Sequence, residues 1–113
     1  MRTQNRITKG EFRDKMRGAT RVNTTHFTLL VKRGTADDTP TQVGFVTPAR
    51  VLGNAVNRNA NRRRLREAAD RLITVYDGIS VVVIVRSDVS TLDVANVTQE
   101  MLDGVQRATR RWA

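Results

Sequence analysis

The chain has 113 residues, a length that predicts a single domain, 1–113, with a hydrophobic core of its own. It contains no cysteine, which excludes disulfides, thiolate metal sites and a cysteine nucleophile, and its longest apolar run, 79–85, is too short to span a bilayer. Twenty Lys and Arg residues against eleven Asp and Glu give a net charge of +9, which is typical of proteins that bind nucleic acid or an anionic membrane. These features predict a soluble, cytoplasmic protein with a polyanionic partner.

The basic residues are mostly arginine, with Lys9, Lys15 and Lys32 as the three lysines. Arginine grips phosphate with two parallel hydrogen bonds and stacks on bases, whereas lysine acts as a hydrated point charge. A GC-rich genome would produce the same preference for arginine, but it does not account for the net charge.

The first predicted element is a short helix over 9–17. Thr8 and Glu11 have the spacing of a capping box, and Gly18 can end the helix in a left-handed conformation. Phe12 then lies on the apolar face of this helix.

Three strands are predicted next. Residues 26–32 (HFTLLVK) and 42–47 (QVGFVT) are separated by a polar loop and are expected to pair as an antiparallel hairpin. Residues 79–86 (ISVVVIVR) form a continuous β-branched run, which is typical of a strand covered on both faces.

A closing amphipathic helix is predicted to begin between Thr91 and Thr98. Its apolar residues recur every three or four positions, as in a helix with one buried face. The order of helices and strands predicts a small α+β or mixed α/β domain with one sheet covered by helices. The apolar positions of the last helix are Val94, Val97, Met101, Val105, Ala108 and Trp112.

The most unusual segment is a predicted helix over 56–76 that carries many arginines. On a helical wheel, one third of the circle is apolar and predicts the buried face. Glu67 lies away from the main arginine stripe, whereas a face that serves solubility alone mixes the two signs more evenly. The buried positions are Leu65, Ala68, Ala69, Leu72 and Tyr76, and the adjoining stripe holds Arg62, Arg66, Asn59 and Arg63, with Arg58 at its border.

This stripe favours RNA over the other polyanions. Zinc ligands, basic-zipper heptads and the helix-turn-helix spacing of DNA-reading proteins are missing, as are the aromatics of an RNA-recognition sheet. A membrane anchor is disfavoured because the helix has an apolar face for the core and no exposed aromatics. We therefore expect recognition of RNA through shape and phosphate, with no DNA and no membrane partner.

Residues 53–67, GNAVNRNANRRRLRE, resemble the pattern G-x-A-V-x-R-N-x-x-[KR]-R-x-x-R-E of the bacterial ribonuclease P protein component. Phe12 in a first helix, a basic turn at 17–21, a strand at Phe27, the GFVT strand and the closing helix occur in the family's order. The resemblance thus covers effectively the whole chain.

The resemblance implies a mixed α/β sandwich with about four strands, three helices and a left-handed crossover through the arginine helix. It also implies a function: the small subunit of a ribonucleoprotein that removes the 5′ leader of precursor tRNA. In that family the catalyst is the RNA subunit with bound Mg²⁺, and the protein performs no bond chemistry. The implied partners are the catalytic RNA subunit and precursor tRNA; the alternative is a ribosomal-type RNA-binding protein without a role in tRNA processing.

The resemblance assigns two sets of site residues. The RNA-binding set is Arg58, Asn59, Arg62, Arg63 and Arg66, with Arg50 in place of the family's lysine pair, and the 5′-leader cleft is Phe12, Met16, Phe27 and Phe45. Met16 stands where the family has a second aromatic, and a thioether stacks more weakly. Asn61 also departs from the family pattern, at a position to which we attach little importance.

The residues themselves offer no protein-borne catalytic centre. His26 is the one histidine, and no nucleophile and base have a recognisable spacing. Asp37 and Asp38 are read as turn residues because a pair of carboxylates without further oxygen ligands makes a weak metal site. We therefore expect no catalytic residue and no metal site in the protein.

Overall fold

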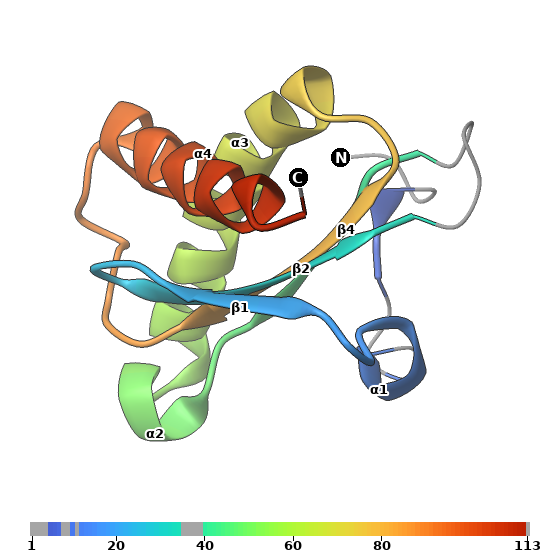
Figure 1. The fold of residues 1–113 in the computed structure, drawn as a ribbon. Coiled ribbons are helices and arrows are strands. Elements are labelled where there is room, and N and C mark those ends of the chain that lie inside the picture. Colours follow the sequence, from blue (N-terminus) through green and yellow to red (C-terminus); the bar gives the residue numbers. More distant parts are fainter. Residues whose placement is uncertain (1–4, 8–9, 11, 35–39, 113) are drawn as a thin grey trace.

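The computed structural model describes residues 5–7, 10, 12–34 and 40–112, which form a four-stranded sheet with helices on both faces (Figure 1). It confirms the predicted α+β class with its mixed sheet. The elements in chain order are α1 (Phe12–Lys15), β1 (Thr20–Asn23), β2 (Phe27–Arg33), β3 (Gln42–Val46), α2 (Ala49–Leu52), α3 (Ala55–Val75), β4 (Ile79–Val85) and α4 (Val94–Arg110).

The sheet has the strand order β1-β2-β4-β3. β2 runs antiparallel to β4, and β3 runs parallel to β4, so that α2 and α3 form a crossover between two neighbouring parallel strands. The predicted hairpin of β2 with β3 is therefore wrong. β4 is apolar along its whole length and almost completely buried, so it occupies a central position with a neighbour on each side.

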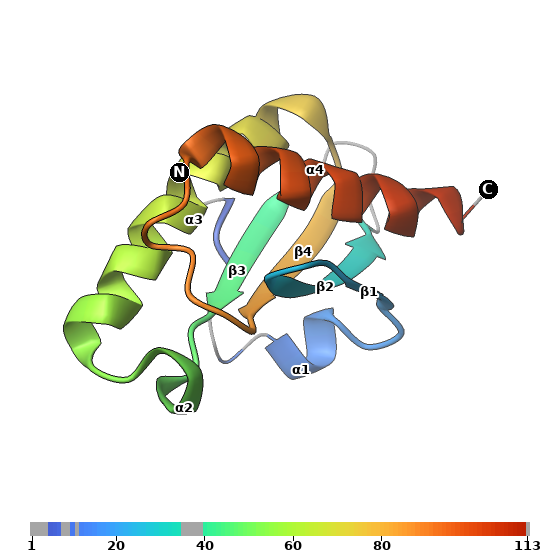
Figure 2. The same cartoon turned by 90° about the vertical axis from the view of Figure 1, so that its left-hand side faces the viewer.

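The main core lies between the sheet and the two long helices. Figure 2 shows α3 and α4 crossing the same face of the sheet, with α1 on the opposite face. Leu65 and Leu72 of α3 and Met101 of α4 are fully buried against β-strand residues such as Val83. These contacts confirm the apolar faces predicted for both helices.

The α1 face of the sheet has a smaller apolar cluster, in which Ile7, Met16 and Val82 are buried. α1 is shorter than the predicted helix, and the capping-box residues Thr8 and Glu11 lie outside the described residues. Gly18 has a φ of 77°, the left-handed conformation expected after the helix.

Two short elements escaped prediction. β1 overlaps the end of the basic turn expected at 17–21; it has one buried apolar residue, Val22, and its pairing with β2 defines it as a strand. α2 is a single helical turn after Pro48 and ends at Gly53, whose φ of 77° suits glycine. Both are too short to carry a periodic signal. Asp37 and Asp38 lie outside the described residues.

α4 is attached to the turn between β1 and β2 through Glu100. Its carboxylate accepts hydrogen bonds from Thr24 Oγ1 (2.6 Å), the His26 amide (2.7 Å) and His26 Nδ1 (2.7 Å). Burial of the carboxyl opposes its ionisation, but the bonds from Thr24 and His26 prevail and lower the pKa of Glu100. His26 therefore joins the turn between β1 and β2 to α4. No helix in the described part of the chain is long and apolar enough to cross a membrane.

Candidate nucleic-acid interface

α3 begins where the sequence predicts, because the side chain of Asn54 caps it by accepting a hydrogen bond from the Asn57 amide (2.9 Å). Its apolar stripe is narrow and includes Ala68 and Ala69, both fully buried, which permit close packing against α4. This packing sets which arginines of α3 face the edge of the sheet.

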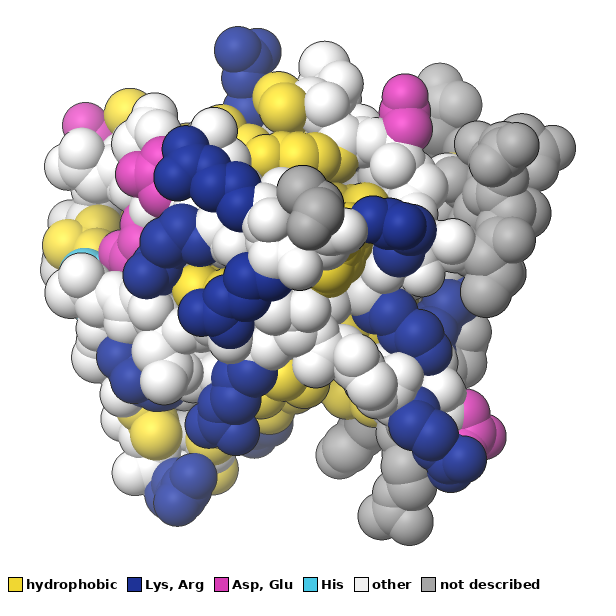
Figure 3. Space-filling view, in the orientation of Figure 1, with side chains coloured by type: hydrophobic (Ala, Val, Ile, Leu, Met, Phe, Trp, Pro, Cys, Tyr) yellow, Lys and Arg dark blue, Asp and Glu magenta, His cyan; other side chains and the backbone are white. Residues whose placement is uncertain are grey.

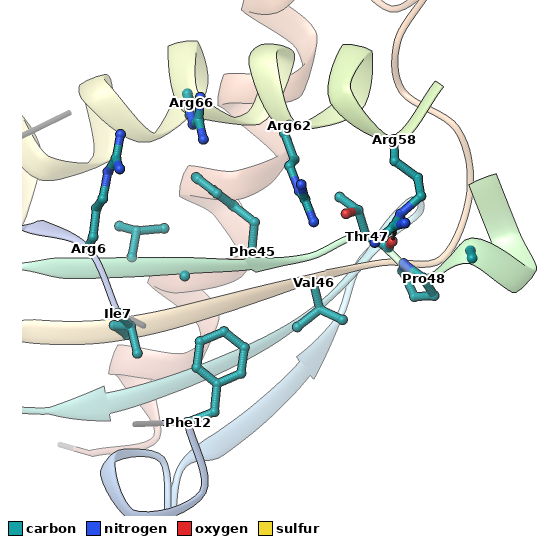
Figure 4. A pocket seen from close by; sticks show the side chains of 13 residues that line it. Arg6, Ile7, Phe12, Phe45, Val46, Thr47, Pro48, Arg58, Arg62 and Arg66 are labelled. Atoms are coloured by element: carbon teal, nitrogen blue, oxygen red, sulfur yellow. Dashed lines mark hydrogen bonds between the residues drawn. The ribbon is translucent and has the colours of Figure 1, made fainter. Parts of the chain in front are cut away.

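A groove of about 550 Å³ lies between α3 and the edge strand β3 and continues toward α1. Figure 4 shows Arg58, Arg62 and Arg66 extending from α3 on one side and Phe12 on the other side of β3. The groove is lined by Arg6, Ile7, Phe12, Val43, Gly44, Phe45, Val46, Thr47, Pro48, Ala49, Arg58, Arg62 and Arg66.

The three groove arginines are spaced four residues apart, which places them in one row along α3. Arg58 is held by a hydrogen bond from its Nε to the Thr47 carbonyl (3.0 Å). Among the described residues, no carboxylate lies within ion-pair distance of Arg58, Arg62 or Arg66. The row thus presents uncompensated positive charge to the groove, as a phosphate-binding surface requires.

The apolar part of the groove contains two aromatic rings. Phe45 stands on the α3 side of β3, and Phe12 lies on the opposite side (Figure 4). A Cβ atom at Gly44 would come within 2.7 Å of the Phe12 ring, so glycine at this position lets the ring lie against the strand. Both rings are partly exposed.

The other predicted RNA-binding residues lie outside the groove. Asn59 and Arg63 are exposed on α3, and Arg50 is exposed on α2. Their neighbour Arg64 differs, since its Nη1 lies 3.8 Å from the Glu67 carboxylate. α3 therefore carries two basic surfaces, one facing the groove and one facing outward.

The cleft assignment is wrong for Phe27. Its side chain is 0% exposed in the core under α4, on the face of the sheet away from α1, and cannot reach a ligand. The sequence does not reveal this position, because Phe27 is the first residue of β2 and the pairing of β2 with its neighbouring strands decides which face of the sheet its side chain lies on. Met16 is buried in the cluster beneath α1 and supports the groove without lining it.

A buried polar network, missed in the sequence, holds α3 in place. Asn61 is 0% exposed; its Nδ2 donates to the Asn57 carbonyl (2.9 Å) and to the Asp88 carboxylate (3.0 Å), while its Oδ1 accepts from the Val89 amide (2.9 Å). The amide and hydroxyl of Ser90, followed by Asn61 and Asn57, lower the pKa of Asp88 to about 2. The low importance given to Asn61 is therefore wrong, because it fixes the arginine row relative to the sheet.

Arg6 and Thr47 also line the groove without having been predicted. Arg6 reaches it because its backbone forms a parallel bridge with Val43 at the edge of β3, a pairing with no local sequence signal. Thr47 is 3% exposed, and its Oγ1 has no hydrogen-bond partner within the described residues. The groove thus combines four cationic side chains with two rings and a buried hydroxyl.

The described residues do not gather three or more His, Asp, Glu or Cys side chains that could hold a metal ion. An arginine row beside partly exposed rings suits phosphates and bases instead. The fold and this groove define a small basic domain of the RNA-binding class.

Comparison with known proteins identifies the family within that class. The ribonuclease P family matches residues 1–109, and the chain therefore belongs to this family, as the protein component of the tRNA-processing ribonuclease. Membership implies an RNA partner in the holoenzyme and decides against the ribosomal alternative.

Curated relatives and solved structures agree with this assignment. The ribonuclease P protein component of Clavibacter michiganensis is 35% identical over 109 residues, covering 95% of each chain, and that of Geobacter sp. (strain M21) is 29% identical over 107 residues, covering 95% of this chain and 90% of the relative. The RNase P protein of Thermotoga maritima has a TM-score of 0.75 at 24% identity, covering 90% of this chain and 96% of that one. A mutant RNase P protein of Staphylococcus aureus has a TM-score of 0.76 at 21% identity, covering 93% and 88%. The last two show the same fold.

Proposed function

We propose that this protein binds the catalytic RNA subunit of ribonuclease P through α3 and holds the 5′ leader of precursor tRNA in the groove beside it. The outer residues Asn59 and Arg63, with Arg50, contact the RNA subunit. The groove arginines bind phosphates where the two RNAs meet, and Phe12 and Phe45 contact bases of the leader.

One observation carries this proposal: the arginine row of α3 and two partly exposed rings line the same groove. Phosphates can bind the row while bases stack on the rings, a combination typical of single-stranded nucleic-acid sites. The proposal does not use Phe27, which is buried.

Cleavage itself is assigned to the RNA subunit, which is proposed to bind Mg²⁺. The described residues offer neither a carboxylate cluster for a cation nor a nucleophile paired with a base, so they do not fit a protein-bound catalytic metal. The protein contributes affinity and position, and the lack of cysteine suits the reducing cytoplasm in which we propose that it acts.

Reconstitution tests the proposal. The purified protein is expected to leave precursor tRNA intact, and the matching RNA subunit alone is expected to be inactive at low Mg²⁺ concentration. Adding the protein should restore removal of the leader and lower KM for precursor tRNA, with a smaller effect on KM for a substrate whose leader is a single nucleotide. Cleavage by the protein without RNA, or an equal decrease in KM for a long leader and for a single-nucleotide leader, would contradict it.

A further inference from the structure

A second set of arginines lies at β1, the edge of the sheet opposite the groove. Arg111 Nη1 donates to the Arg21 carbonyl (3.1 Å) and Arg107 Nη2 to the Asn23 carbonyl (2.8 Å). Arg86 Nη2 donates to the carbonyls of residues 24 (2.6 Å) and 25 (3.3 Å) in the following turn. Arg86, Arg107 and Arg111 are called the β1 arginine row below.

These bonds fix the guanidinium groups without neutralising them. Each arginine uses an amino group on uncharged carbonyl oxygens and keeps further N–H donors, and all three side chains are exposed. Within the described residues, no carboxylate lies within ion-pair distance of any member of the row. A guanidinium that is already held loses less conformational entropy when a ligand binds.

A purely structural role, in which the β1 arginine row covers the exposed edge of β1, would explain the hydrogen bonds to the strand carbonyls but not the positive charge of the row. Any donor that occupies the outward carbonyls of β1 would block pairing with another strand. The row instead uses full positive charges, and exposed Arg21 and Arg110 add two more nearby. Figure 3, which views the molecule onto α4 and β1, shows Lys and Arg side chains spread across this face.

The acidic groups of this region are fewer than its arginines. Glu100 and Asp103 share a shallow hollow with Arg107, where Glu100 accepts from Thr24 and His26 and Asp103 accepts from the Gln99 amide (2.8 Å), whereas the row and its exposed neighbours Arg21 and Arg110 supply five positive charges. Figure 3 shows acidic side chains mostly near the left edge of this face, with others toward its right. The arginines beyond them carry the excess charge.

We propose that the β1 arginine row binds the phosphate backbone of double-helical RNA, as a second RNA-binding surface independent of the groove. Carbonyls of alternate residues in a strand are about 7 Å apart, so Arg107 and Arg111 can reach separate phosphates. A duplex fits better than a single strand because the described residues of this face offer no free ring for a base. Trp112 lies under the Arg33 guanidinium (5.0 Å), and its Nε1 donates to Thr20.

The test compares two probes on the full chain, a short blunt-ended RNA duplex and an oligouridylate. In the variant Arg107→Gln/Arg111→Gln, the glutamine amides can still donate to the strand carbonyls, but two charges are removed. Duplex affinity should fall, and the slope of log K against log salt should decrease by about 1.4 to 1.8, since each phosphate contact contributes roughly 0.7 to 0.9. Binding of oligouridylate should stay within twofold.

The matched control is Arg64→Gln/Arg71→Gln, which removes two charges from α3 residues that neither line the groove nor reach β1. It should keep the wild-type salt slope for the duplex. An equal decrease in this control would overturn the proposal, because net charge alone would then explain it, and so would an unchanged slope in the Arg107/Arg111 variant.

Two further variants separate the possible failures. Arg107→Lys/Arg111→Lys keeps both charges and should retain duplex binding. It therefore tests the proposal even if the glutamine variant does not fold. Loss of duplex binding by a folded lysine variant, with an unchanged salt slope, would contradict a site that depends on charge. Arg62→Gln/Arg66→Gln should weaken oligouridylate binding. Adding the Arg107→Gln/Arg111→Gln substitutions to it should still decrease the salt slope of duplex binding. The two surfaces can therefore fail independently.

Discussion

The two faces of the sheet differ in function: one contains the main hydrophobic core, and the other has a small apolar cluster beside the groove. The face under α3 and α4 contains nearly all of the large, fully buried residues, including Phe27 and Leu65. The α1 face has a small cluster that opens at β3 into the arginine-lined groove. α3 contributes to both, with leucine and alanine in the core and Arg58, Arg62 and Arg66 at the groove. Stability and binding thus depend on different side chains of one helix and can be changed separately.

The strongest test of this separation replaces a core ring. Phe27→Ala removes a side chain that is 0% exposed, so the free energy of unfolding should fall by about 3–5 kcal/mol. Urea denaturation measures this change. A loss below about 1 kcal/mol would show that Phe27 is not part of the core.

Phe12→Ala is the matched change on the groove side. Its ring is partly exposed, so the loss of stability should be smaller than for Phe27, while affinity for oligouridylate should fall by about 1–3 kcal/mol through lost stacking. Fluorescence anisotropy gives the affinity. Unchanged binding by a folded Phe12→Ala protein would remove Phe12 from the proposed leader contact.

Replacing the groove arginines should affect binding and not stability. Arg62→Ala/Arg66→Ala removes two charges that have no ion-pair partner among the described residues, so the salt slope of RNA binding should decrease by about 1.4 to 1.8. The melting temperature should hardly change, because surface substitutions typically alter stability by about 0.5 kcal/mol or less. A large drop in melting temperature would mean that the row is structural.

Asn61→Ala tests the network that holds α3 against the loop after β4. It leaves the Val89 amide without its partner and removes a donor to Asp88, which should cost about 1–3 kcal/mol of unfolding free energy. Asn59→Ala, at an exposed position on the same helix, is the control and should stay within about 0.5 kcal/mol. Similar losses in both variants would falsify the role assigned to the buried network.

The smallest expected effect is a pH dependence at the same network. Ser90 and Asn61 lower the pKa of Asp88 from 3.8 to about 2, so the ionised carboxylate stabilises the fold above pH 3.8 and this contribution is lost as the pH falls toward 2. The stability gap between the wild type and Asp88→Asn should narrow over this range in urea titrations. Solvent screening keeps the effect small, since Asp88 is exposed. A gap that is constant down to pH 2 would contradict this assignment.

The sequence by itself determined the elements with strong periodicity. The arginine helix was located to within one residue at each end, the last helix begins within the predicted window from Thr91 to Thr98, and β4 was identified as a strand buried on both faces. Local chemistry was sufficient here because apolar spacing reports helix faces and strand burial directly. The spacing from Arg58 to Glu67 also carried the resemblance to the family that the comparisons confirm.

Only the tertiary structure decided how these elements come together. Strand pairing across long connections leaves no local signal in the sequence. The sequence therefore did not show that β4 lies between β2 and β3, or that β1 is a strand. The pairing of the strands also directs the side chain of Phe27 into the core. The fold brings Phe12, from a distant segment of the chain, to the groove that the arginines of α3 line. It also buried Asn61 against Asp88 and directed Arg107 and Arg111 to β1, because a side chain's surroundings depend on residues far away in the chain.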